Sequence, residues 1–196
     1  KGKALRLEKD AAIFYERAGN LTVPGAVSFR VKFFRDRIPN PQKSPPFNYT
    51  YLWFTEFKNS GYAGIQDSVY GRLNFWAHYF PGISHKNVEG PLPWEKDRWY
   101  HVLANLHEQK IELYLDGRFL AQATLERPWK AEEFSPFRFG SGGDQRFAID
   151  EAAFFSRTLE RSEIERLALG EESVDGKIGW FPSLRSVSVE AVMDAA

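Results

Sequence analysis

The stretch that decides the fold reads Ile149-Asp150-Glu151-Ala152-Ala153-Phe154-Phe155-Ser156-Arg157-Thr158-Leu159, and Glu163-Ile164 follows it. Two signatures precede it in the chain, Trp99-Tyr100-His101-Val102 and Leu113-Tyr114-Leu115-Asp116-Gly117. The Asp-Gly pair that ends the second signature is a hairpin signal, because two-residue hairpin turns need residues that tolerate positive φ. The segments therefore predict strands joined by tight turns.

The strands are marked by hydrophobic alternation. In residues 27–34 every second side chain is apolar, which is typical of a half-buried strand. Further strands are expected at 4–7, 13–15, 48–57, 73–80, 99–106, 111–116 and 119–124. One helix is expected over 160–169, because an apolar face ends there at Gly170. Many strands with one late helix favour a sandwich over alternating strands and helices.

The order and spacing of these motifs resemble the laminin-G-like, concanavalin A-like jelly-roll family in its bacterial form. Its members typically read Trp-x-His-Val, Leu-Tyr-x-Asp-Gly, a Gly-rich strand, Ile-Asp-Glu and Arg-x-Leu-x-x-x-Glu-Ile. The resemblance implies an all-β antiparallel sandwich of jelly-roll type with one short C-terminal helix. It covers residues 4–170, but these motifs leave the proline-rich and aromatic insertions within residues 35–98 unassigned. The matching segments are residues 99–102, 113–117, 139–143, 149–151 and 157–164.

The domain organisation follows from this resemblance. We expect residues 1–170 to form a LamG-like β-sandwich domain and residues 171–196 to form a C-terminal extension, either a closing strand or a linker. The resemblance also implies a secreted or cell-surface multidomain protein. Because the chain begins with Lys1 rather than Met, we expect it to derive from a longer precursor.

The composition excludes several classes of function. The 26 acidic and 26 basic residues cancel, so the net charge gives no reason to expect a nucleic-acid partner. No run of 18 apolar residues occurs, so we expect no membrane insertion. Cysteine is absent, which excludes disulfides, thiol nucleophiles and cysteine-ligated zinc. Aromatic residues make up 16% of the chain, more than a core alone is expected to need.

A glycan-binding surface is predicted from strand alternation. If the middle strands share one sheet, their outward side chains combine flat rings with amides, imidazoles and a carboxylate. Rings cover the apolar faces of sugars, and polar groups bind sugar hydroxyls that would otherwise be buried without partners. The alternative is that a loop or a neighbouring domain covers this face as a second core. The predicted ligand-binding residues are Tyr49, Tyr51, Trp53, Asn74, Trp76, His78, His101, Asn105, Glu112 and Tyr114.

Asp150 is the candidate metal ligand. The resemblance implies a structural Ca²⁺ in some relatives, bound by the aspartate of Ile-Asp-Glu and by backbone carbonyls, and Ca²⁺ takes six to eight oxygen ligands. The alternative is that Asp150 accepts backbone N–H groups at a turn, as short acidic side chains often do.

The predicted function is that of a non-catalytic binding module of a secreted or surface multidomain protein, with a glycan or a neighbouring protein domain as partner. One alternative is a polysaccharide-degrading enzyme of the same fold. A hydrolase needs two carboxylates on one strand face, which no strand offers, whereas a lyase could use His and Tyr, with His78, His101 and Tyr114 as candidates. The other alternative is a structural domain that packs on a partner.

Overall fold

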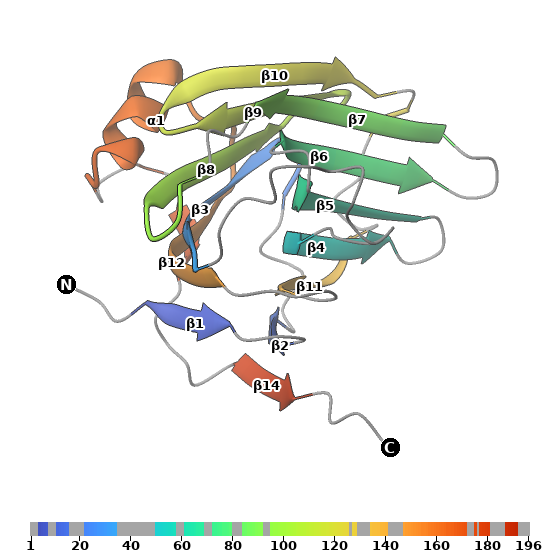
Figure 1. Ribbon diagram of the computed structural model, residues 1–196. Helices are drawn as coiled ribbons and strands as arrows, with labels where there is room; N and C mark the ends of the chain where they lie inside the picture. The colour runs from blue at the N-terminus through green and yellow to red at the C-terminus, as the bar shows by residue number, and fades with distance from the viewer. Residues whose placement is uncertain are drawn as a thin grey trace.

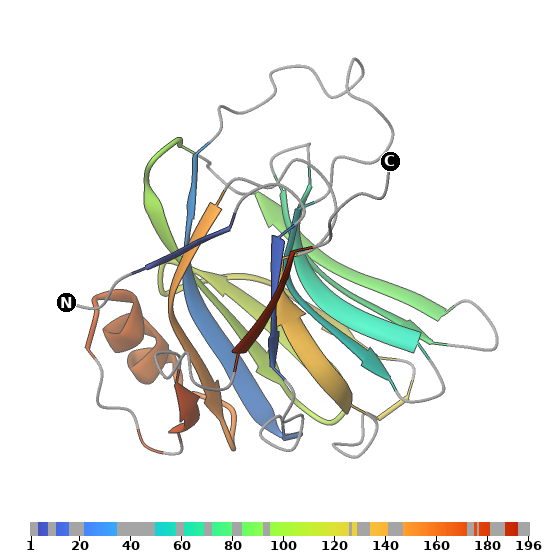
Figure 2. The same cartoon turned by 90° about the horizontal axis from the view of Figure 1, so that it is seen from below.

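Two antiparallel sheets face each other across a shared apolar interior (Figure 1). Seen from below, helix α1 (Arg161–Ala168) lies on the outside of one sheet, away from the other (Figure 2). The computed structural model describes residues 4–7, 11–15, 22–34, 50–57, 61–68, 72–79, 84–91, 95–125, 127–128, 134–140, 147–171, 175, 177–180 and 187–191.

Sheet A carries the helix. Its strands run in the spatial order β1 (Leu5–Leu7), β12 (Phe147–Phe155), β3 (Gly25–Phe33), β8 (Trp99–Leu106), β9 (Lys110–Leu115) and β10 (Arg118–Thr124). Strand β13 (Lys177–Trp180) pairs with the other end of β12. All these pairs are antiparallel.

Sheet B forms the opposite layer. It runs β14 (Val187–Ala191), β2 (Ala11–Tyr15), β11 (Phe134–Phe139), β4 (Thr50–Phe57), β5 (Gly61–Ser68), β6 (Arg72–Tyr79) and β7 (Ser84–Pro91). The predicted all-β antiparallel sandwich with one short helix is confirmed.

The interior is made of alternate side chains from both sheets. Phe29 of β3 meets Phe139 of β11 edge to face, with ring centroids 5.5 Å apart. The predicted inward residues of β6, β8 and β9 lie in this core, because one face of each strand must be buried in a two-layer sandwich. They are Leu73, Phe75 and Ala77, then Val102, Ala104 and Leu106, and then Ile111, Leu113 and Leu115.

Strand β4 departs from the predicted alternation. Tyr51 pairs with Gln66, but the next paired residue is Trp53, which lies opposite Ile65, so Leu52 is an extra residue in a bulge. Leu52 and Trp53 are both fully buried in the core. The predicted outward position of Trp53 is therefore wrong, because a one-residue insertion moves every following side chain to the other face.

Two glycines allow close approaches that position the edges of the sandwich. Asp116 and Gly117 have φ of 49° and 78°, as the Asp-Gly signal of the β9–β10 hairpin predicts. A Cβ on Gly117 would lie 3.2 Å from the Glu165 Cα atom of helix α1. A Cβ on Gly90 of β7 would lie 2.2 Å from the Leu120 Cγ atom of β10, so the edge strands of the two sheets meet at this glycine.

Candidate functional site

The predicted binding residues do not share one sheet. His101, Asn105, Glu112 and Tyr114 belong to sheet A, whereas Tyr51, Trp53, Asn74, Trp76 and His78 belong to sheet B. The expectation of one continuous surface is wrong, because the chain crosses to the opposite layer between β7 and β8. Tyr49 and the side chains of Tyr51 and His78 lie outside the part of the chain that the structure describes.

Helix α1 covers the outer face of sheet A. His101, Asn105 and Tyr114 point away from the main core, as predicted, but their exposed fractions are only 3%, 1% and 9%. The outer face of sheet A is therefore a second core, as in the alternative to a glycan-binding surface, and helix α1 of the same chain covers it. The second core beneath the helix consists of Ala26, Leu103, Tyr114, Ala153, Phe155, Leu159 and Ile164, with Leu167 packed against it.

Asn105 fixes the segment that enters the helix. Its Nδ2 donates to the Leu159 carbonyl at 2.9 Å, and its Oδ1 accepts from the Leu159 N–H at 2.9 Å. The side-chain amide thus pairs with the backbone as a neighbouring strand would. The geometry assigns Asn105 to holding the chain rather than to binding a ligand.

Glu112 is the centre of a second polar cluster on the outer face of sheet A. Lys110 Nζ lies 2.6 Å from its carboxylate, the Tyr114 hydroxyl 3.1 Å and His107 Nε2 3.2 Å. Burial alone would raise the pKa of Glu112, but contacts with Lys110, His107, Asn105 and Tyr114 outweigh it and hold the pKa at about 2. Burial and the neighbouring carboxylate raise the pKa of Tyr114 to about 12, so its phenol is protonated and unsuited to act as a base.

The Glu112 cluster predicts an acid-dependent loss of stability. A carboxyl whose pKa falls from 4.5 to about 2 on folding stabilises the folded state above pH 4.5. This contribution is lost as the pH falls from 4.5 through 2. We expect Glu112→Gln to flatten the pH dependence of the melting temperature in this window, measured by circular dichroism. An unchanged acid slope in the variant would contradict the assignment.

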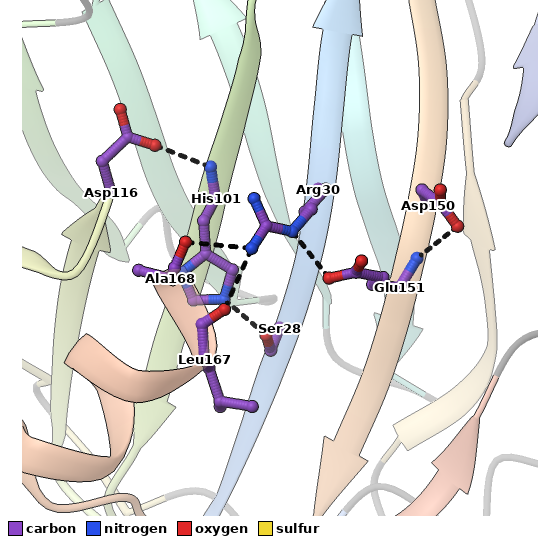
Figure 3. A network of polar contacts seen from close by, with 8 residues as sticks. All are labelled: Ser28, Arg30, His101, Asp116, Asp150, Glu151, Leu167 and Ala168. Carbon is purple, nitrogen blue, oxygen red and sulfur yellow. Dashed lines mark hydrogen bonds and ion pairs between the residues drawn. The ribbon is translucent and has the colours of Figure 1, made fainter. Parts of the chain in front are cut away.

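His101 and Ser28 form a buried pair that superficially suggests a nucleophile and its base. The Ser28 hydroxyl lies 2.8 Å from His101 Nε2 (Figure 3). However, Asp116 accepts from the His101 backbone N–H, not from the ring, and no described residue forms a hydrogen bond with His101 Nδ1. Burial, helped by the nearby Arg30, lowers the pKa of His101 to about 3. A catalytic base needs a higher pKa and an orienting partner, so this pair does not support hydrolysis.

Arg30 joins the Ile-Asp-Glu motif to the end of the helix. Its Nε donates to Glu151 at 2.6 Å, and its Nη2 donates to the carbonyls of Leu167 and Ala168 at 3.1 and 2.9 Å (Figure 3). A cation at a helix C-terminus satisfies carbonyls that have no partner within the helix. Glu151 has a φ of 50° at a β-bulge of β12, where the irregular backbone brings its carboxylate to Arg30.

Asp150 lies beside this network. Its Oδ1 accepts the Glu151 N–H at 2.9 Å, which is the backbone contact that sequence reasoning gave as the alternative to a metal. Since Glu151 is paired with Arg30, this segment offers few free oxygens, and the described residues contain no group of three or more His, Cys, Asp or Glu side chains that could hold a metal. The described side chains alone therefore supply fewer than the six to eight oxygens that Ca²⁺ takes, and backbone carbonyls would have to supply the others. A structural Ca²⁺ at Asp150 stays a prediction.

The outer face of sheet B retains two of the predicted residues side by side. Asn74 and Trp76 alternate with the core residues Leu73 and Phe75 along β6, and Trp76 belongs to neither core cluster. Both are 5% exposed, so neither forms an open aromatic platform. Within the part of the chain that the structure describes, no group donates a hydrogen bond to Asn74 Oδ1, although this atom is buried.

Gln66 is a polar residue of this face that the sequence prediction missed. It is the register partner of Asn74 across β5 and β6, and it is 9% exposed. Gly64, the register partner of Trp76, contributes no side chain beside the indole ring. Strand β5 was not predicted, because its two glycines interrupt any hydrophobic alternation.

A comparison with protein families identifies the chain. The model described as the concanavalin A-like lectin/glucanases superfamily, of laminin-G type, matches residues 42–165. The chain belongs to this superfamily. The match includes most of the segment 35–98 that the sequence motifs left unassigned. A comparison with curated protein sequences gave no match.

Solved structures share the jelly roll of this superfamily member. The SAP-like pentraxin of Limulus polyphemus has a TM-score of 0.62 at 15% identity, covering 93% of this chain and 86% of its own. The binding domain of botulinum neurotoxin serotype D has a TM-score of 0.66 at 16% identity, and the match covers 86% of this chain and 43% of the neurotoxin chain. Trypanosoma rangeli sialidase has a TM-score of 0.61 at 18% identity, and the match covers 87% of this chain and 28% of the sialidase chain. The chain thus spans less than half of the last two proteins, and at these identities the likeness concerns the fold.

Proposed function

We propose that this jelly roll is a non-catalytic binding module that recognises a glycan through the outer face of sheet B. The observation that carries the proposal is the Asn74 amide, which is 5% exposed and whose Oδ1 accepts no hydrogen bond from the described residues. A buried polar group without a partner costs about 1–3 kcal/mol, so a ligand hydroxyl that donates to it regains this free energy on binding.

The surroundings of Asn74 support a sugar as the ligand. Gln66 offers a second amide in the neighbouring strand, and Trp76 lies two residues along the same face. Amides bind sugar hydroxyls as donors and acceptors, and an indole contacts the apolar face of a sugar ring. The family description, which includes lectins and glucanases, and the binding domains among the similar structures agree with a binding role.

A catalytic role has less support. Among the described residues no acid orients the Ser28–His101 pair, and burial lowers the pKa of His101 to about 3, which makes it a weak base. A secreted or cell-surface location remains part of the proposal, since a glycan-binding module is useful where polysaccharides occur.

Asn74→Leu tests the proposed site. The substitution keeps the volume and removes the amide, so we expect a melting temperature that is unchanged or higher, with at least a fivefold weaker affinity for the polysaccharide that wild-type protein binds. The measurement is isothermal titration with a panel of polysaccharides, and Gln122→Leu on the exposed face of β10 is the matched control. Equal affinities of the wild type and Asn74→Leu would contradict the site.

A further inference from the structure

Four adjacent strands of sheet A place a row of residues beyond the end of helix α1. Arg6 of β1 pairs with Ala148 of β12, Ala148 with Lys32 of β3, and Lys32 with Trp99 of β8. The positions next to them along β1, β3 and β8 lie in the core, so the row belongs to the outer face. The core positions are Leu7, Val31, Phe33 and Tyr100.

Two cations and two rings meet in this row. Lys32 Nζ lies 5.0 Å from the Trp99 ring centroid and 5.1 Å from that of Phe34. Arg6 Cζ lies 4.7 Å from the same Phe34 ring. The short side chain of Ala148 separates the two cations along the row. Such cation–ring contacts orient the ammonium group of Lys32, but they do not neutralise it.

The charge of Lys32 is not balanced by a carboxylate of the described residues, among which it forms no ion pair. The neighbouring Arg98 differs, since it pairs with Glu95 and Asp116. Asp97 approaches this end of β3 through its backbone N–H, which donates to the Phe33 carbonyl at 2.8 Å, and its carboxylate makes no ion pair with Lys32. An ammonium group that lies between two rings, without an ion pair among the described residues, favours a bound anion.

The row is accessible to a ligand. Arg6 is exposed, and Lys32, Phe34 and Trp99 are half-buried. Arg30, two residues before Lys32 in β3, donates to the carbonyls of Leu167 and Ala168 at the end of helix α1. Since the chain carries equal numbers of acidic and basic residues, attraction of an anion must arise from such a local site rather than from the net charge.

We propose that Arg6, Lys32, Phe34 and Trp99 form a second binding site, which takes the carboxylate or sulfate group of an acidic glycan. Lys32 binds the anionic group by a charge-assisted hydrogen bond, and the ring edges contact the sugar that carries it. The inference rests on the proposed glycan-binding function for the identity of the polymer. The acidic group is inferred from the charges of the row alone.

Lys32→Gln in the full chain is the test, with heparin as the sulfated polymer, polygalacturonate as the carboxylated one, and dextran and xylan as neutral polymers. We expect the affinity for whichever acidic polymer binds to fall about tenfold, since a hydrogen bond to a charged group contributes about that factor. Lys32→Arg keeps the charge and should retain binding. Arg118→Gln, which removes an exposed cation on β10, should leave acidic-polymer binding unchanged.

The outcomes separate this inference from the proposed function. Binding of neutral polymers alone would overturn the acidic site and leave the proposed function intact, whereas binding of no polysaccharide would overturn both. Equal binding of an acidic polymer by the wild type and Lys32→Gln would also overturn the site. Polyglutamate that binds as tightly as the acidic polysaccharides would show that charge alone is recognised, which contradicts a sugar ligand.

Discussion

Trp53→Ala is expected to lower the free energy of unfolding by about 3–5 kcal/mol, the range for deleting a large buried ring. Trp53 is fully buried, and its ring centroid lies 6.1 Å from that of Phe75 in the sandwich interior. For a chain of this size the loss corresponds to roughly 10 °C in melting temperature. Thermal unfolding followed by near-ultraviolet circular dichroism measures it.

Trp53→Phe is the matched control, because it keeps a ring in the same place. We expect it to recover more than half of the lost stability, as volume-conserving changes in a core do. If Trp53→Ala instead melted like the wild type and lost only glycan affinity, Trp53 would belong to a binding surface. That result would also contradict the bulge in β4, which places Leu52 and Trp53 together in the core.

Sequence alternation predicted well where strands are regular. Val102 and Leu113 lie inside as expected, because β8 and β9 pair without a register shift over their shared length. The Asp116-Gly117 turn was also predictable, since few residues adopt positive φ at two consecutive positions. In both cases the local pattern contains all that determines the structure.

The errors arose where an outcome depends on residues distant in the sequence. A bulge leaves little trace in composition, so Trp53 could not be assigned to the core from β4 alone. The alternation of β8 correctly placed His101 and Asn105 outside the main core. It could not tell that helix α1, more than 50 residues later in the chain, covers them.

The row of Arg6, Lys32 and Trp99 also depends on residues that are distant in the sequence. Each residue follows the outward alternation of its own strand, and nothing in the sequence connects Arg6 or Lys32 with Trp99. Their proximity results from the order β1-β12-β3-β8, in which the first and the twelfth strand are neighbours. A binding site assembled in this way becomes visible only when the register of all four strands is known.

Asn105 provides the second large expected effect. Replacing it with Ala leaves the Leu159 N–H and carbonyl without their partners in a region where Leu159 is 4% exposed. Each unsatisfied buried group costs about 1–3 kcal/mol, so we expect Asn105→Ala, which leaves both groups unsatisfied, to lower the free energy of unfolding by about 2–6 kcal/mol. Urea unfolding measures the total, and hydrogen exchange at the Leu159 amide reports whether the loss begins at the helix entry.

Asn105→Leu separates hydrogen bonding from packing, because leucine has a similar volume and cannot bond to the backbone. We expect it to be about as destabilising as Asn105→Ala and to accelerate exchange at Leu159 equally. Gln122→Ala, on the exposed face of β10, should change stability by less than about 0.5 kcal/mol. If Asn105→Leu restored wild-type stability, packing alone would hold the helix, and the paired bonds to Leu159 would contribute little to docking α1 on sheet A.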